Sequence, residues 1–435
     1  MSQTNLLEIG CQNTEVSKNK MFEEIYEQDD IFLKRKIIIN KHVFQTKLLA
    51  EDTSDDLSKS WIQNQLLGKK TKYSETKKVN IVDLCCSAGG LTLGAFEAVK
   101  ALSMQPKSLF AADIDKSALD VYQANFNPAI TSNLSISDFI DYSLKDFVNE
   151  KTFNYEPEII HDELGSLRGK VDLFLAGPPC QGHSNLNNKT RGDDPRNNLY
   201  LDAIAIAVAL GAKKIIIENV NTIKAAKHNI VNTGMKILKQ YNYKCTECTI
   251  NANDVGGGQT RIRHFLIASI DALPNAKIIL DHIKRPKITL KDIFDLKPKL
   301  KINANLLHTA DYSEENIKRI NYLFDHDLYD LPDHVRPDCH KDGGHNRPAV
   351  YGRLFLDKPS PTITSGFMSP GRGRYVHPKE RRALTPHEGA RIQGFPDSFQ
   401  FNGAPSTKLG KWIGDAVPSS LSYTATLICL ASDYL

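Results

Sequence analysis

The sequence lacks the features that mark secreted and membrane-embedded proteins. Its eight cysteines follow no spacing typical of a disulfide framework, as expected for reduced thiols. No apolar signal segment opens the chain, and its most apolar stretch, 201–220, is interrupted by Asp202, Lys213 and Lys214. We therefore expect a soluble, cytoplasmic protein that does not contact a membrane.

The chain also has little net charge, only +4, although 24% of its residues are charged. A strongly basic surface is therefore excluded, and any contact with nucleic acid must come from local patches. With 435 residues, of which 41% are hydrophobic, the chain is long enough for two domains with a large core and an appendage.

One stretch organises the rest, residues 177–182 with the sequence GPPCQG. It follows the apolar run 171–176, which we predict to be a buried strand. Two prolines make the loop stiff and exclude both helix and ladder pairing. The loop would present Cys180 at the carboxyl edge of a parallel sheet, where open α/β folds bind ligands. Taken alone, it is equally compatible with a buried, inert thiol.

A second unit begins with strand 80–84 and the small-residue turn 85–90, CCSAGG. Helix 91–100, strand 108–112 ending in Asp113, and helix 116–126 follow. This order is typical of a nucleoside-binding α/β unit, in which small residues allow close approach and the acid accepts ribose hydroxyls. The turn does not match G-x-G-x-x-G and lacks a phosphate cradle. It therefore favours S-adenosylmethionine over NAD, while a turn without a ligand stays an alternative.

The pattern then repeats around the same edge. Helix 199–211 precedes strand 214–217, which delivers Glu218, and the glycine loop 256–258 precedes Arg261 and Arg263, which we expect on one strand face. Surface arginines on an edge are the alternative. The polar segment 183–198 beside Cys180 predicts a mobile lid, or else a plain solvated loop.

The flanking regions carry weaker signals. Residues 1–75 predict a partly ordered packing or docking arm with an apolar patch at 37–44 and a helix at 57–67. The stretch from about 273 to 345 predicts a smaller, irregular domain, and the basic cluster 371–382 beyond it suits DNA phosphates or is simply solvated. The pair Cys245 and Cys248 and the irregularly spaced histidines predict no metal site.

Taken in order, these stretches resemble the DNA (cytosine-5)-methyltransferases over roughly residues 79–435. The matching segments are 83–90 (DLCCSAGG), 177–182 (GPPCQG), 218–220 (ENV), 259–263 (QTRIR), the stretch 347–364 and 414–418 (GDAVP). The resemblance implies an α/β, Rossmann-like S-adenosylmethionine-dependent domain formed by 76–275 and 385–435. It also implies a target-recognition domain at 276–384, after the N-terminal extension 1–75.

The resemblance further implies the chemistry of the site. Cys180 would add to C6 of a cytosine flipped out of the duplex, so that C5 attacks the methyl group. Glu218, with a pKa raised by burial, would hold the N3/N4 edge of the base, and Arg263 with Arg261 would contact O2 and a flanking phosphate. Asp415 stands where the family usually has Asn. The implied cofactor contacts are Leu84, Cys85, Ser87, Ala88, Gly89, Gly90, Leu91, Asp113, Ile114, Pro179, Leu199, Asp415 and Ala416; the implied DNA contacts are Ser184, Lys189, Arg191, Arg196, Arg372 and Arg374.

The implied function is sequence-specific DNA (cytosine-5-)-methyltransferase activity in restriction-modification or host DNA marking. Double-stranded DNA is the expected partner of a monomer, and a cognate restriction endonuclease acting on the same site stays open. Three alternatives remain at this point: the same chemistry on transfer RNA, a DNA-binding module without catalysis, and a nicotinamide oxidoreductase. The last has no phosphate loop to support it.

Overall fold

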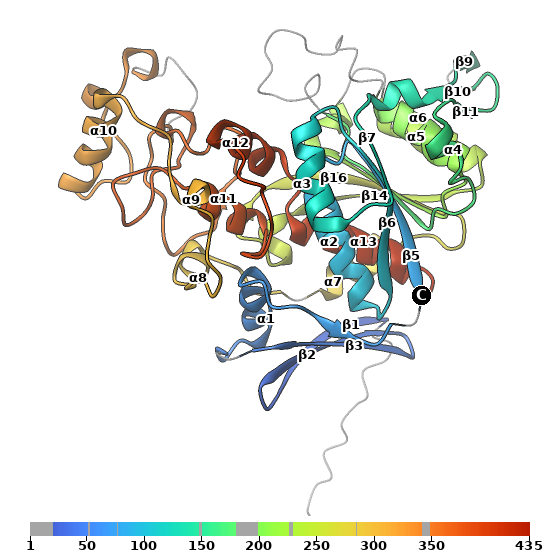
Figure 1. The fold of residues 1–435 in the computed structure, drawn as a ribbon, viewed down its shortest axis with the longest axis horizontal. Helices are drawn as coiled ribbons and strands as arrows, with labels where there is room; N and C mark the ends of the chain where they lie inside the picture. Colours follow the sequence, from blue (N-terminus) through green and yellow to red (C-terminus); the bar gives the residue numbers. More distant parts are fainter. Residues whose placement is uncertain are drawn as a thin grey trace, which may run out of the picture.

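The computed structural model describes residues 21–50, 53–75, 77–147, 150–179, 199–225, 229–283, 285–341 and 349–435. Within them, a seven-stranded sheet is covered by helices on both faces, a small N-terminal sheet packs below it, and a lobe of short helices lies to one side (Figure 1).

The central sheet has the predicted α/β topology. Its strands lie in the order β14 (Lys244–Asn251), β16 (Ile262–Ser269), β13 (Lys214–Val220), β12 (Leu173–Ala176), β5 (Lys78–Leu84), β6 (Gln105–Ala112) and β7 (Ile130–Ser132). β16 is antiparallel to both of its neighbours, whereas the pairs from β13 to β7 are parallel. Because strand order reverses between β5 and β12, a ligand crevice is expected at their carboxyl ends.

Both faces of the sheet are buried, which explains why its strands read as continuous apolar runs. In β12, Leu173 and Leu175 belong to the core under α2 (Gly90–Ala101) and α13 (Ser419–Ala431). Phe174 and Ala176 point to the opposite core, under α5 (Leu199–Leu210) and α6 (Ile230–Gln240). Alternation of side chains along each strand thus fills two separate hydrophobic layers.

Several predicted helices are confirmed, and their starts have a clear cause. In α1 (Leu57–Leu66), the Asp56 side chain accepts hydrogen bonds from the backbone N–H groups of Ser58 and Lys59. In α3 (Lys116–Phe126), Asp115 accepts from the N–H of Ser117. Such aspartates satisfy backbone donors that a helix leaves free at its first turn.

The N-terminal extension contains a sheet that the sequence analysis did not predict. β1 (Phe22–Asp29), β2 (Phe32–Ile39), β3 (His42–Leu49) and β4 (Lys72–Tyr73) form an antiparallel meander. Asp30 and Asn40 adopt left-handed backbone angles at the two tight turns, as these residue types tolerate. Residues 21–50 of this extension are therefore a packed sheet, which the sequence analysis did not foresee.

The lobe beside the sheet is irregular and takes in most of residues 276–384. It contains α8 (Leu290–Phe294), α9 (Ala304–Leu307), α10 (Glu314–Asp325) and β17 (Ser360–Pro361). α11 (Pro386–Gln393) and α12 (Ser406–Asp415) share its hydrophobic cluster, whereas α7 (Ala276–His282) packs into the core under the large sheet. The remaining short elements are β8 (Ile140–Asp141), β9 (Leu144–Phe147), β10 (Glu150–Phe153), β11 (Glu158–Ile159), α4 (Asp162–Gly165) and β15 (Gln259–Thr260).

Candidate active site

Three of the singled-out stretches meet at the carboxyl edge of the central sheet. Ala176 at the end of β12 pairs with Leu84 of β5 on one side and with Ile217 of β13 on the other. The next residue, Gly177, is anchored by its N–H to the Leu84 carbonyl oxygen at 3.2 Å. A Cβ placed on Gly177 would lie 3.9 Å from Glu218 Oε2, so the start of the GPPCQG loop lies beside this carboxylate.

Glu218 is buried next to an arginine on the neighbouring strand. Val220 pairs with Arg263 across β13 and β16, and Arg263 Nε lies 2.9 Å from Glu218 Oε1. Burial raises the pKa of the Glu218 carboxyl, and the charges of Arg263 and Arg261 only partly oppose this rise. Burial therefore shifts this carboxyl toward its protonated form, the direction that proton donation by a carboxylic acid needs.

Asn219, to which the sequence analysis gave no separate role, connects Glu218 to the loop. Its side chain is buried, and Nδ2 donates to the carbonyl oxygen of Pro178 at 3.3 Å. The available signal was its place in the Glu218–Val220 triplet at the end of a predicted strand. The bond holds the first proline of the loop against the strand that carries Glu218.

The two predicted arginines have different surroundings. Arg263 faces Glu218, whereas Arg261 is buried and its Nη1 donates to the carbonyl oxygens of Ile363, at 2.6 Å, and Gly414, at 3.0 Å. Arg261 thus ties the approach to β16 to the lobe and to the 414–418 turn. Its predicted contact with a base stays a prediction.

Gln259, just before Arg261, reinforces the same junction. Its side chain is fully buried, and Nε2 donates to Gln393 Oε1 at 2.8 Å. Its Oε1 accepts from the Ile363 N–H at 3.0 Å, and Gln393 in turn donates to the Ile413 carbonyl oxygen. The segment that presents Arg263 is therefore tied by buried side-chain hydrogen bonds to α11 and to the end of α12.

The small-residue turn after β5 is bound to the acid at the end of β6. The N–H of Ser87 donates to Asp113 Oδ2 at 2.8 Å, and Asp113 Oδ1 accepts from the Asp115 N–H at 2.8 Å. Burial raises the pKa of Asp113. Next to it, Ile114 is 75% exposed, an unusual state for a large apolar side chain. An anchored acid beside an uncovered apolar side chain suits a ribose and an adenine face.

The 414–418 turn lies directly on this loop. A Cβ on Gly90 would lie 2.8 Å from the Val417 carbonyl oxygen and 3.0 Å from Ala416 Cβ, so only glycine fits here. Asp415, which replaces the usual Asn, forms an ion pair with Lys411 at 2.8 Å. The added negative charge therefore has a positive partner one helical turn earlier.

The other predicted cofactor residues divide into three groups. Leu84, Ala88, Leu91 and Ala416 have buried side chains, so contacts at Leu84 and Leu91 would come from their backbone. Cys85 and Ser87 have φ angles of 55° and 47°, and Gly89 has a φ of 91°, which marks the turn as tightly wound. Pro179 and Leu199 border the segment 180–198.

Some of the predicted catalytic and DNA-contacting residues lie outside the described residues, as does the predicted lid. These residues are Cys180, Ser184, Lys189, Arg191 and Arg196.

Most arginines of the predicted basic patch 371–382 are already paired with acceptors in other parts of the protein. Arg374 donates to the backbone oxygens of Tyr329 and Arg353 and contacts Asp330. Arg381 and Arg382 pair with acids on α10 and α11. Arg372 is exposed and forms no ion pair among the described residues. Of the two predicted DNA contacts Arg372 and Arg374, it is therefore the one whose charge is not paired with an acid there.

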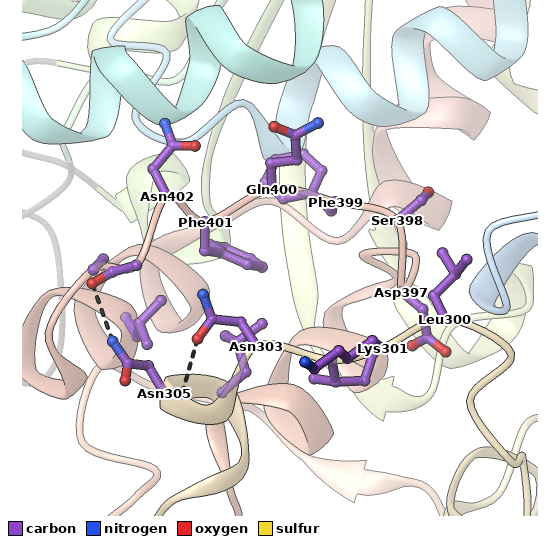
Figure 2. Close-up of a pocket in the computed structure, with 15 residues that line it drawn as sticks. Leu300, Lys301, Asn303, Asn305, Asp397, Ser398, Phe399, Gln400, Phe401 and Asn402 are labelled. Atoms are coloured by element: carbon purple, nitrogen blue, oxygen red, sulfur yellow. Dashed lines mark hydrogen bonds between the residues drawn. The ribbon is translucent and has the colours of Figure 1, made fainter.

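One cavity of about 370 Å³ lies away from this edge. It separates residues 300–306 from the loop 397–404, and Asn305 crosses its end to bond the Gly403 carbonyl oxygen at 3.1 Å (Figure 2). None of the predicted site residues lines it. We assign the chemistry to the sheet edge because the titratable groups and the predicted motifs meet there.

Within the described ranges, no helix has the length and apolar content needed to cross a membrane. One set of possible metal ligands lies close together there, His377, Glu380 and Glu388. Arg382 already donates to Glu380 at 2.8 Å and to both carboxylate oxygens of Glu388 at 2.7 and 2.6 Å. These carboxylates therefore belong to an ion-pair network.

Comparisons with known proteins agree with this geometry. The chain is 38% identical over 373 residues to the type II methyltransferase M1.BsuMI of Bacillus subtilis, covering 85% of this chain and 84% of the relative. It is 28% identical over 355 residues to the type II methyltransferase M1.HphI of Haemophilus parahaemolyticus, covering 78% and 84%. A Spodoptera frugiperda DNMT2 mutant structure shares the fold, with a TM-score of 0.52, 19% identity and coverage of 81% and 99%. The family model "C-5 cytosine-specific DNA methylase" matches residues 79–426, and the chain therefore belongs to this family of methylases.

Proposed function

We propose that this protein transfers a methyl group from S-adenosylmethionine to C5 of cytosine within a specific sequence of double-stranded DNA. The observation that carries the proposal is the buried Glu218–Arg263 pair beside the start of the GPPCQG loop. Because the similar proteins are named type II methyltransferases, we further propose that it protects DNA in a restriction-modification system.

The proposed nucleophile is Cys180. Its thiolate forms a bond to C6 of the extruded cytosine, and the C5–C6 π electrons become available at C5 for attack on the methyl group. Loss of the C5 proton and elimination of the thiolate then restore the aromatic ring. A free thiol is only a few per cent ionised at pH 7, so the site must raise its thiolate fraction.

Glu218 and Arg263 would act on the opposite side of the base. Addition of sulfur to C6 builds negative charge on the ring at N3 and O2. A protonated Glu218 donates to N3 and limits this charge, and its buried environment favours that protonation state. Arg263 fixes the orientation of the Glu218 carboxyl and supplies a positive charge for O2.

The proposed place for the methyl donor is the edge of the sheet around Asp113 and the turn 85–90. When bound, S-adenosylmethionine supplies an electrophilic methyl group on a sulfonium. Asp113 would accept from the ribose hydroxyls and Ile114 would cover the adenine. The backbone of residues 85–90 and the 414–418 turn would enclose the rest, and the Lys411–Asp415 pair would limit repulsion of the methionine carboxylate.

We propose that residues 276–384 form the target-recognition domain. Specific readout needs side chains that reach base edges, while phosphate contacts set the register. Arg372 is the proposed phosphate contact from this domain because its guanidinium is exposed, and Ser184, Lys189, Arg191 and Arg196 of the segment 183–198 are the proposed contacts beside the nucleophile.

The test is methyl transfer from labelled cofactor to mixed-sequence duplex DNA, with transfer RNA as a parallel substrate. We expect 5-methyldeoxycytidine as the labelled nucleoside, confined to one sequence context. Cys180→Ser should abolish the label, whereas the matched variant Cys245→Ser, which alters a half-buried thiol on β14, should not. Label in transfer RNA alone, or on an exocyclic nitrogen, would refute the proposal.

A further inference from the structure

Asp202 is a buried carboxylate to which the proposed reaction gives no part. It lies in the first turn of α5, the residue is only 6% exposed, and no lysine, arginine or histidine of the described ranges forms an ion pair with it. Burial raises the pKa of this carboxyl, while the hydroxyls of Tyr142 and Ser137 act in the opposite direction. Removing a carboxylate from water without a cationic partner costs free energy, and the positive end of the α5 dipole offsets only part of that cost. An acid at this position therefore needs a reason other than packing.

Two hydroxyl groups from a neighbouring segment hold the carboxylate. Ser137 Oγ donates to Asp202 Oδ2 and Tyr142 Oη donates to Asp202 Oδ1, both at 2.7 Å. Ser137 belongs to η1 (Ile136–Phe139), the 3₁₀ helix that follows β7, and Tyr142 comes directly after β8. Because each oxygen accepts one short, directional bond, Asp202 fixes both the spacing and the orientation of α5 relative to residues 136–142.

The two joined segments border the place proposed for the adenosine part of the cofactor. Asn133, between β7 and η1, donates through Nδ2 to the Asp113 carbonyl oxygen at 2.8 Å. α5 begins at Leu199, one helical turn before Asp202, and Leu199 packs against the same hydrophobic core as Cys85 of the small-residue turn. Asp202 therefore joins the loop bound to Asp113 to the helix whose first residue is a proposed cofactor contact.

We propose that Asp202 is a positioning residue for the adenosine part of S-adenosylmethionine, an inference that rests on the proposed methyltransferase function. Asp202 does not contact the cofactor, because its side chain is buried and both oxygens are engaged by hydroxyl groups. It acts through Leu199 and residues 133–137, whose separation it sets before the cofactor binds, so that binding does not have to organise them. An apolar side chain of similar size would be cheaper to bury, but it would leave the two segments without a directional bond.

Calorimetric titration of the full chain with S-adenosylmethionine tests the proposal. Ser137→Ala and Tyr142→Phe each remove one bond to Asp202 and should weaken cofactor binding about 3- to 10-fold, a part of what a hydrogen bond to a charged group contributes. Ser137→Thr keeps the hydroxyl and should restore most of the affinity. Tyr155→Phe is the matched control, because it removes an exposed tyrosine–aspartate bond, to Asp141 Oδ1 at 2.9 Å, and should leave the affinity unchanged.

Two further measurements separate positioning from a general loss of stability. 5′-Methylthioadenosine contains the adenosine but no amino-acid part, and Ser137→Ala and Tyr142→Phe should weaken its binding by the same factor as that of the whole cofactor. In methyl transfer, the KM for the cofactor should rise by that factor, while kcat at saturating cofactor should stay within about twofold of the wild type. The affinity for duplex DNA should not change.

Unchanged cofactor affinity in both Ser137→Ala and Tyr142→Phe would overturn the positioning role, and so would an equal loss in Tyr155→Phe. A lower kcat with an unchanged KM would also contradict it, because Asp202 would then affect the chemical step and not the pocket. These outcomes all require a wild type that binds S-adenosylmethionine. A wild type that binds none would refute the proposed function itself, on which this inference rests.

Discussion

Replacing Glu218 by Gln separates the shape of this side chain from its proton. The glutamine keeps the size and the contact with Arg263, but it cannot transfer a proton to N3 of the base. Glu218 is buried, with its side chain 10% exposed, and burial outweighs the attraction of Arg263, so its pKa is raised. General acids of this kind contribute about 10²- to 10⁴-fold to a rate. We therefore expect kcat to fall by that factor, equivalent to ~3–5 kcal/mol in the barrier.

The pH dependence should change in a specific direction. In the wild type, the protonated fraction of Glu218 falls tenfold per pH unit above its pKa, so kcat should decline on the alkaline side. Ionisation of Cys180 should increase kcat from the acid side, giving a bell-shaped profile. The variant has no acid to lose, so only the ascending limb should remain.

The assay is single-turnover transfer of labelled methyl groups to duplex DNA. A range from about pH 5.5 to 9.5 covers the ionisation of both Glu218 and Cys180. Glu247→Gln is the matched control, because Glu247 lies on β14, two strands away from Glu218 in the same sheet, is 40% exposed and pairs with His264. It should leave the profile unchanged. A Glu218→Gln enzyme with kcat within threefold of wild type, or with the alkaline decline intact, would refute the proton-donor role.

Four further outcomes are expected. Cys180→Ser should abolish transfer, because the thiolate is lost, while cofactor affinity by calorimetry stays unchanged. Asp113→Asn should weaken cofactor binding about 10- to 100-fold in the same assay, since a hydrogen bond to a charged group contributes ~1.5–3 kcal/mol. Gly90→Ala should destabilise the protein by ~1–3 kcal/mol in denaturant titrations, because its Cβ would lie 2.8 Å from the Val417 carbonyl oxygen. Burial raises the pKa of Asp83 to about 7, so the folded state binds a proton that the unfolded state releases. Asp83 should therefore contribute a fall of a few kcal/mol in the unfolding free energy as pH rises from about 4 to 7, and the difference in slope between the wild type and Asp83→Asn should equal this contribution.

Much of the catalytic domain could be predicted from the sequence because its signals are local. Strand runs such as 171–176 are buried on both faces, and α1 and α3 begin at aspartate caps. Parallel strands also bring their carboxyl ends together whatever their order, which is why Glu218 was expected beside the loop of Cys180.

The remainder depended on partners that are distant in sequence. In β2, alternate residues face inward, and one of them is Arg35, which stacks between Trp61 and Tyr423. Because a charged residue occupies an inward position, the sequence does not show the alternation of apolar and polar residues that predicts a strand. In the 371–382 cluster, a run of arginines indicated a phosphate surface, but Arg374 and Arg381 pair with Asp330 and Asp325. Those acids follow or belong to α10, and no local pattern reveals that pairing.

The contact between Gly90 and the turn before α13 has a consequence for how the enzyme is made. The cofactor loop comes from the first strand of the central sheet, but the turn that closes it and the helix packed on α2 come from the last part of the family segment. During synthesis, a nascent chain would therefore present an open loop until α13 leaves the ribosome. With the cofactor contacts proposed above, the pocket for the methyl donor would close only after residues 276–384 have been translated.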